Sequence, residues 1–199
     1  MDAKKNILEN IGELLGQIHI VKRDSYFGGW EDLPHRPIFN DFIAYRKRND
    51  ERIIIKINDQ CLPDQKLFNK AIDTLKESYK FLDRNFLSSI THRDFSYRNM
   101  IVQKVDNEVT FKGLIDFEHC QMDDPCIDFN TLYQYNMLNQ GILEEIFFKS
   151  YKKYMNLPED FEKRKKYYMI NLGLHTCSWS YNTAKDFYRN GIELLNKLL

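Results

Sequence analysis

A charged loop followed by two apolar segments limits how the middle of this 199-residue chain can fold. The loop reads His92-Arg93-Asp94-Phe95-Ser96-Tyr97-Arg98-Asn99. Residues 100–102 and 109–115 are apolar and rich in β-branched side chains, and the turn-forming pair Asp106-Asn107 lies between them. This order of residues predicts a small β-hairpin that begins directly after the charged loop.

The spacing within residues 92–99 matches the pattern H-R-D-x-x-x-x-N of phosphotransferase catalytic loops. That chemistry needs a carboxylate to orient an attacking hydroxyl and accept its proton. It also needs an amide, a short loop away, to hold a metal ion beside the phosphates. Asp94 is therefore the candidate base and Asn99 a candidate metal ligand, whereas His92 is expected to orient the loop rather than to react.

The second motif, Gly113-Leu114-Ile115-Asp116-Phe117-Glu118, follows one hairpin length later. It places Asp116 at the end of an apolar strand, where a second magnesium ligand would face Asn99 across the phosphates. Asp94, Asn99 and Asp116 are thus predicted to form one site, with turn and cap roles as the alternative. For Glu118 two readings stay open: it approaches a second metal ion, or it faces solvent.

A helix is predicted to start within residues 123–128. Asp124 is a favourable N-cap, and Pro125 suits the first helical position. Asp128 then lies one turn into the helix, beside the site. A buried carboxylate there would accept backbone N–H bonds from the catalytic loop, so Asp128 is predicted to support the loop.

Residues 92–128 resemble the catalytic core of the aminoglycoside phosphotransferase and choline kinase family, distant relatives of the protein kinases. Residues 11–19, from Ile11 to His19, show a weaker similarity to the helix that opens the C-terminal lobe in that family. The resemblance implies that Asp94 is the catalytic base and that Asn99 and Asp116 hold Mg²⁺. It also implies ATP or GTP as the phosphoryl donor and a scaffold role for the aspartate at position 128.

Two details distinguish this chain from the protein kinases. Glu118 stands where their Asp-Phe-Gly motif has glycine. Only eleven residues separate Asp116 from Asp128, too few for a peptide-binding activation loop. The expected acceptor is therefore the hydroxyl of a small molecule rather than of a protein.

The remaining sequence predicts a mainly α fold with one small β-hairpin (α+β), as in the C-terminal lobe of a protein-kinase-like phosphotransferase. Residues 52–57 (RIIIKI) read as a strand or as a buried turn of helix. The other expected elements are helices over residues 4–20, 38–48 and 63–85, an irregular connection around Gly28-Gly29, Pro34 and Pro37, and about four helices beyond Pro125 broken near Gly141, Pro158 and Tyr181-Asn182.

One domain is expected over residues 1–199, with a catalytic loop at 92–99, a metal-binding segment at 113–118 and a helical substrate-side region at 125–199. No G-x-G-x-x-G occurs in the sequence. Lys56 in Ile53-Ile54-Ile55-Lys56 resembles the strand lysine of kinases, but it follows the helix that opens the C-terminal lobe, where that lysine is not expected. The N-terminal lobe that grips ATP is therefore expected to be absent from this chain.

The balance of charge bears on partners and location. Lys and Arg number 29, as do Asp and Glu, so no net field favours nucleic acid or an anionic membrane as partner. No apolar run near the N-terminus fits a signal peptide, and the four cysteines show no metal-ligand spacing, so a cytoplasmic protein with free thiols is expected. Where the missing lobe would lie, an exposed apolar face predicts a homodimer or a separate N-lobe partner.

Two functional classes remain open at this stage: an active small-molecule kinase, or a catalytically inactive remnant or binding module, including one half of a split enzyme. Side chains in the C-terminal region could contribute to an acceptor site, or be ordinary core and surface residues. These are the aromatic residues Trp179, Tyr181, Phe187 and Tyr188 and the acids Glu144, Glu145, Asp186 and Glu193.

Overall fold

The computed structural model describes residues 2–33, 36–106, 108–134, 137–138 and 141–199. The chain forms two compact units, the first made of residues 1–40 and 86–159 and the second of residues 41–85 and 160–199. Helices dominate both units, and the described strands are antiparallel and confined to the first, so the predicted fold class is confirmed. Among the described residues, no helix is long and apolar enough to cross a membrane.

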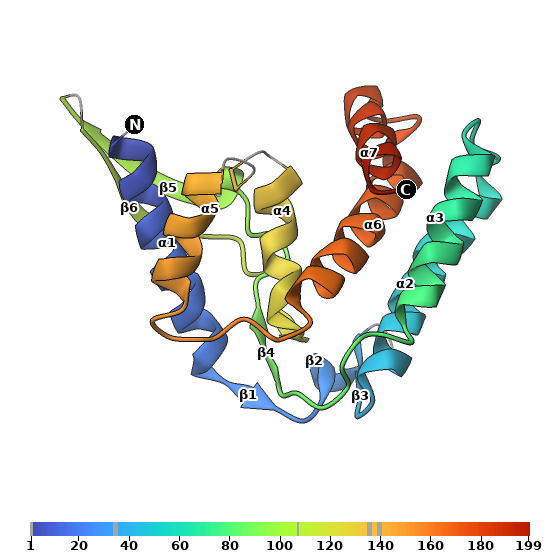
Figure 1. Ribbon diagram of the computed structural model, residues 1–199, viewed down its shortest axis with the longest axis horizontal. Coiled ribbons are helices and arrows are strands. Elements are labelled where there is room, and N and C mark those ends of the chain that lie inside the picture. The colour runs from blue at the N-terminus through green and yellow to red at the C-terminus, as the bar shows by residue number, and fades with distance from the viewer. Residues whose placement is uncertain (1, 34–35, 107, 135–136, 139–140) are drawn as a thin grey trace. The chain divides into compact units, whose positions relative to one another are not determined.

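Helix α1 (Asp2–Val21) confirms the helix expected over residues 4–20 and packs against α5 (Gly141–Tyr151). Figure 1 shows these two helices side by side. Gly12 and Gly16 permit the close approach, because a Cβ atom on Gly12 would lie 2.5 Å from the carbonyl oxygen of Phe147. The buried stripe of α1 consists of Leu8, Ile11 and Leu15.

A five-stranded sheet in the first unit has the order β1-β4-β7-β2-β3, with antiparallel neighbours throughout. Its strands are β1 (Arg23–Asp24), β2 (Phe27–Leu33), β3 (Arg36–Phe39), β4 (Ser88–Thr91) and β7 (Gln121–Asp123). Ile90 of β4 pairs with Met122 of β7. The strand that enters the catalytic loop therefore lies beside the strand that enters the Asp124 segment.

Strands β2 and β3 correct the expectation of an irregular connection in this region. Gly28 has φ +112°, and a Cβ atom there would lie 2.2 Å from the carbonyl oxygen of Pro37, so glycine is needed where the two strands approach. Pro37 lies on β3, an edge strand whose pairing with β2 is irregular between Gly28 and Leu33, and both features tolerate a residue without an N–H. Pro34 lies outside the described residues.

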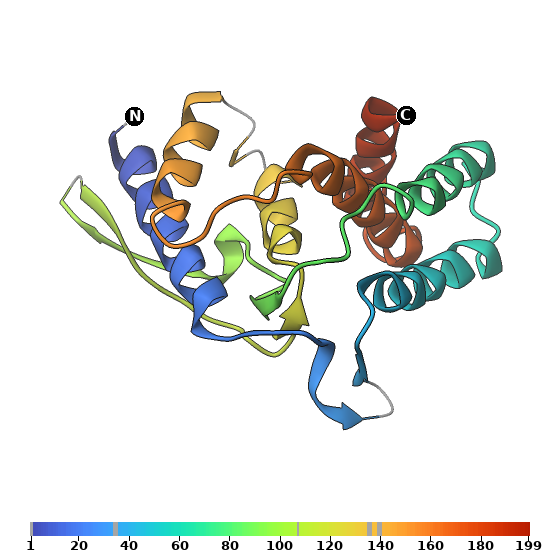
Figure 2. The ribbon, with the colours of Figure 1, turned by 60° about the horizontal axis from the view of Figure 1, so that its bottom comes forward.

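The predicted hairpin is present as β5 (Met100–Val105) and β6 (Glu108–Leu114). Met100 pairs with Leu114, and Asp106 adopts φ +52° at the turn. Asn107, the other expected turn residue, lies outside the described residues. Figures 1 and 2 both show the hairpin alongside α1.

The second unit is a helical assembly in which α6 packs against α2, α3 and α7 (Figure 2). Its helices are α2 (Phe42–Asp59), α3 (Gln65–Ser78), α6 (Phe161–Ser180) and α7 (Lys185–Leu198). Residues 52–57, including Lys56, belong to α2, so the strand interpretation was wrong. The Asp41 side chain caps α2 by accepting the Ala44 N–H at 2.6 Å, and buried positions continue along the helix to Ile57.

Other boundaries also shifted. The helix expected from residue 38 begins only at Phe42, and the helix expected to reach residue 85 ends at Ser78. Beyond Pro125 the chain is helical as predicted. It forms the 3₁₀ turn η2 (Pro125–Asp128), then α4 (Phe129–Gln134), α5, α6 and α7.

A buried polar cluster organises the second unit around the fully buried Asp50. Its carboxylate accepts hydrogen bonds from the hydroxyls of Tyr79 at 2.7 Å and Tyr167 at 2.6 Å, and from the Asn171 amide at 2.6 Å. Arg46 Nη2 lies 3.8 Å from Asp50 Oδ1. Burial raises the pKa of Asp50, while Arg46 and the three donors act in the opposite direction. These partners together offset the cost of burying the Asp50 carboxylate, so the loss of any one of them should lower the free energy of unfolding.

A Tyr167→Phe substitution is expected to lower the free energy of unfolding by about 2 kcal/mol. The hydroxyl of Tyr167 donates to Asp50 and accepts from Arg46 Nε at 3.0 Å, so its loss leaves two buried groups short of a partner. Urea unfolding would measure the change. Tyr154→Phe is the control, because it removes a hydrogen bond from the exposed Gln17 and should cost less than about 0.5 kcal/mol. Equal losses in both variants would contradict the role of the cluster.

Candidate active site

The catalytic loop leaves the sheet at the end of β4 and turns through η1 (Tyr97–Asn99) into the hairpin. Asn99 is buried, and its Nδ2 donates to both the main-chain oxygen and the carboxylate Oδ2 of Asp94, each at 2.9 Å. The structure therefore brings the candidate base and a candidate metal ligand together. Because both bonds use the amide nitrogen, the Asn99 Oδ1 atom is left for another partner.

Asp116 is tied to the same loop through its backbone neighbour. The Ile115 N–H donates to the Asn99 carbonyl at 2.9 Å, and His92 Nε2 donates to the Ile115 carbonyl at 2.9 Å. His92 Nδ1 lies 3.3 Å from the N–H of Asp94 and is placed to accept from it. His92 thus joins the catalytic loop to the segment that carries Asp116. Both ring nitrogens are used in hydrogen bonds to the backbone.

The side chain of Asp116 is exposed, and its φ of +68° is left-handed. Non-glycine residues adopt this conformation only where surrounding structure holds them, and such positions cluster at functional sites. The bonds on either side of Ile115 supply that hold.

Asp128, in η2, is fully buried beneath the loop. Its Oδ2 accepts the His92 N–H at 2.8 Å and its Oδ1 accepts the Arg93 N–H at 2.6 Å. Asp124 caps η2 by accepting the Cys126 N–H at 2.9 Å, as predicted. The carboxylate therefore holds two consecutive peptide groups at the start of the catalytic loop.

His19 lies in the segment that resembles the lobe-opening helix, and although no site role was predicted for it, it completes this support. Its Nε2 donates to Asp128 Oδ2 at 3.0 Å, and its Nδ1 is hydrogen-bonded to the Tyr151 hydroxyl at 2.9 Å, all within the buried interior. Burial is the main cause of the raised pKa of Tyr151, so that hydroxyl stays protonated and able to donate. The signal for His19 was its place on α1, where it continues the stripe of buried positions 8, 11 and 15.

Further contacts fix the loop laterally. Arg93 adopts φ +67°, and its Nη1 lies 3.3 Å from the buried carboxylate of Asp123. Thr131 of α4 donates its hydroxyl to the Phe95 carbonyl at 2.5 Å. Arg98 Nη2 stands 3.9 Å from Asp94 Oδ1, beside the candidate base. The loop is thus attached to the sheet, to α4 and to η2.

The residues present fit a magnesium ion. Asn99 and Asp116 offer an amide oxygen and a carboxylate, and Mg²⁺ prefers oxygen ligands, often taking only one or two from the protein and the rest from phosphates and water. Among the described residues, no three His, Cys, Asp or Glu side chains gather as a metal site. Glu118 instead lies 3.4 Å from His119 Nε2, and both side chains are exposed.

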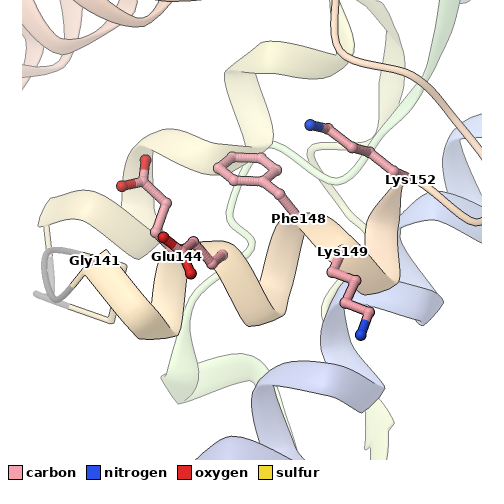
Figure 3. Close-up of a pocket in the computed structure, with 6 residues that line it drawn as sticks. Gly141, Glu144, Phe148, Lys149 and Lys152 are labelled. Atoms are coloured by element: carbon pink, nitrogen blue, oxygen red, sulfur yellow. The ribbon is translucent and has the colours of Figure 1, made fainter.

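The acids considered for an acceptor site lie in two places. Glu144 and Glu145 line an open pocket of about 500 Å³ along α5 with Phe148, Lys149 and Lys152 (Figure 3). Glu144 also accepts a hydrogen bond from the buried Tyr133 hydroxyl. In α7, Asp186 pairs with Arg189 at the surface.

The aromatic residues considered for an acceptor site lie on α6, at its C-cap residue Tyr181, and on α7. The rings of Trp179 and Phe187 have centroids 5.5 Å apart, and those of Tyr181 and Tyr188 are 5.0 Å apart. Tyr188 is buried, and its hydroxyl donates to Asp64 at 2.7 Å. Tyr188 is therefore a core residue, while Trp179 is partly exposed.

Comparison with known proteins gives a family and a fold. The model of the phosphotransferase enzyme family matches residues 1–165. Similar solved structures include a thermostable mutant of aminoglycoside phosphotransferase APH(4)-Ia (TM-score 0.64, 13% identity, 98% of this chain and 66% of that one). Choline kinase LicA from Streptococcus pneumoniae is another (TM-score 0.60, 17% identity, 97% and 64%).

Spectinomycin phosphotransferase APH(9)-Ia, in a complex with ADP and spectinomycin, is similar as well (TM-score 0.58, 13% identity, 97% of this chain and 61% of that one). None of the curated proteins matches the sequence. At these identities the structures show the fold alone. The present chain spans only about three fifths to two thirds of the length of these proteins.

Proposed function

This chain belongs to the phosphotransferase enzyme family, and from that premise we propose that it transfers the γ-phosphoryl group of ATP or GTP to a hydroxyl of a small molecule. The observation that carries the proposal is the pairing of Asp94 with Asn99 in a loop whose backbone is bound to Asp128. A loop whose side chains are held in place before the substrate binds suits phosphoryl transfer, because positioning and electrostatic stabilisation supply most of the catalysis.

Asp94 is proposed to accept the proton of the acceptor hydroxyl. Its Oδ2 is held by the Asn99 amide, while Oδ1 faces Arg98 at 3.9 Å. A side chain held in this way loses little freedom when the acceptor arrives, and the carboxylate keeps lone pairs to orient the hydroxyl. The acceptor class remains small hydroxyl compounds such as choline or an aminoglycoside, which the names of the similar proteins support.

Asn99 Oδ1 and the Asp116 carboxylate are proposed to hold Mg²⁺ with the nucleotide phosphates. When bound, the ion offsets the negative charge of the transferring group. Nucleotide use is supported by the ADP in the spectinomycin phosphotransferase complex. We place the activity in the cytoplasm, where a reducing environment keeps thiols such as those of Cys61 and Cys177 unoxidised.

The nucleotide clamp is proposed to come from another polypeptide segment, because these 199 residues contain no glycine-rich loop. The hairpin and its flanks expose several large apolar side chains to solvent. These are Tyr97, Ile101, Val102, Val105, Ile115 and Phe117, each 45–56% exposed. A separate N-lobe or a second copy of this chain would cover this face. The lack of a glycine-rich loop in these 199 residues also supports the second candidate function, an inactive remnant or binding module.

Isothermal titration with ATP and magnesium tests the metal site. We expect magnesium-dependent binding by the wild-type chain, weakened at least about tenfold by Asp116→Ala, because that change removes one of two protein ligands. Glu118→Ala is the matched control, since it removes a nearby exposed carboxylate that pairs with His119. Equal weakening in both variants contradicts the assignment. If the wild-type chain does not bind, the split-enzyme or remnant alternative is favoured.

A further inference from the structure

A second cavity, in the helical unit, has no part in the proposed reaction. It measures about 550 Å³ and lies between the end of α3 and the start of α6. Its lining includes Thr74, Ser78, Phe81, Leu82, Lys163 and Lys166. We propose that this cavity binds a small aromatic carboxylate, with the ring on the apolar floor and the carboxylate on the two lysines.

The floor of the cavity presents carbon rather than polar atoms. The hydroxyls of Thr74 and Ser78 are committed to their own helix, donating to the carbonyls of Lys70 and Thr74 at 2.8 Å each. Phe81 is a large apolar side chain left 61% exposed, and Leu82 beside it is buried. A flat apolar ring would therefore bury the Phe81 face without removing any unpaired polar group from water.

The charges around the cavity favour an anion. Glu77 is balanced by Lys80, whose Nζ lies 2.6 Å from its carboxylate. Lys163 and Lys166 lie three residues apart on one face of α6, and neither makes a hydrogen bond or ion pair within the part of the chain that the structure describes. Glu77 and Glu162 equal the two lysines in number, so the lining itself is neutral, and Lys80 beside Glu77 brings the charge around the cavity to one positive.

The walls of the cavity are fixed before any ligand arrives. Arg164 is buried, and its Nε lies 2.6 Å from Asp160 Oδ1, while Asp160 Oδ2 accepts the Asp83 N–H at 3.1 Å. Arg164 also donates to the Asp83 carbonyl at 3.3 Å. This clamp joins the start of α6 to the segment after α3. A largely apolar cavity of this size with a few charged side chains in its lining is typical of a small-molecule site.

Titration with 2-naphthoate, followed by ligand-observed NMR, tests the proposal, and the neutral 2-naphthamide reports the contribution of the charge. We expect the carboxylate to bind at least about tenfold more tightly than the amide. The double variant Lys163→Ala/Lys166→Ala should weaken naphthoate about tenfold and leave naphthamide unchanged. The matched control is Lys149→Ala/Lys152→Ala, two lysines at the same spacing that line the pocket along α5 (Figure 3), and it should change neither affinity.

Three results would overturn the inference: no binding of naphthoate at millimolar concentration, equal affinity for the amide, or equal weakening by the control pair. None of them bears on phosphoryl transfer, because the probe contains no hydroxyl acceptor and the variants leave residues 92–128 unchanged. A Phe81→Ala variant adds an independent check, since it should weaken both probes by removing the ring on which they stack.

Discussion

An Asp128→Ala variant is expected to lose about 3–5 kcal/mol of unfolding free energy. The buried carboxylate accepts from the backbone N–H groups of His92 and Arg93 and from the His19 ring. Alanine removes the acceptor of all three donors, two of them buried and one part-buried, and each donor left unsatisfied in the interior costs about 1–3 kcal/mol. Urea unfolding measures the loss. Amide hydrogen exchange at His92 and Arg93 should rise at the same time, because these N–H groups lose their acceptor.

Asp41→Ala is the matched control for this experiment. Asp41 also accepts a backbone N–H, from Ala44 at 2.6 Å, but it is exposed and makes a single capping bond. Its loss should cost about 1 kcal/mol. If Asp128→Ala costs no more than Asp41→Ala, the buried carboxylate does not hold the loop. If the alanine variant is unfolded in buffer, the exchange measurement moves to Asp128→Asn, which keeps one acceptor oxygen.

The support matters because the loop contains unfavourable backbone conformations. Arg93 and Asp116 both have left-handed φ values, +67° and +68°, which non-glycine residues adopt at a cost. Hydrogen bonds hold both positions. The Arg93 N–H donates to the Asp128 carboxylate, and next to Asp116 the backbone of Ile115 is bound to Asn99 and to His92. These bonds place the Asp94 and Asp116 side chains on segments that cannot easily relax.

The hairpin and the Asp124 cap could be predicted because their signals are local. Apolar segments rich in β-branched residues on either side of Asp106-Asn107 predict a hairpin, and Asp124-Pro125 predicts a helix start. Both elements are present in the structure. The proximity of Asp94 and Asn99 also follows from a spacing of five residues. Such features need no knowledge of the rest of the fold.

Non-local contacts explain what the sequence did not reveal. His19 and Asp128 are 109 positions apart, and only the packing of α1 brings them to 3.0 Å. Strands β2 and β3 lie in a segment whose glycines and prolines predict a loop. They form because Gly28 admits the close backbone of Pro37 and because β3 is an edge strand. In residues 52–57, burial along one face of α2 prevails over β-branched propensity.

Asp94→Asn is expected to lower the rate of phosphoryl transfer by about 10²–10⁴-fold in any preparation that turns over ATP, with or without an added N-lobe segment. The change keeps the shape of the side chain and an oxygen that can accept from Asn99, yet it removes the basic carboxylate. A coupled assay over a panel of hydroxyl acceptors, with water as the reference acceptor, measures turnover. Urea unfolding should show little change, because Asp94 is partly exposed and asparagine keeps an oxygen for the Asn99 amide.

Asp106→Asn separates the loss of the base from a general effect of removing an aspartate. Asp106 is exposed at the hairpin turn with φ +52°, a conformation that asparagine tolerates, so turnover and stability should both stay at the wild-type level. Undiminished turnover in Asp94→Asn would remove Asp94 from the role of base. It would leave the Asn99 and Asp116 metal proposal standing, since the titration of Asp116→Ala tests that pair independently of any acceptor.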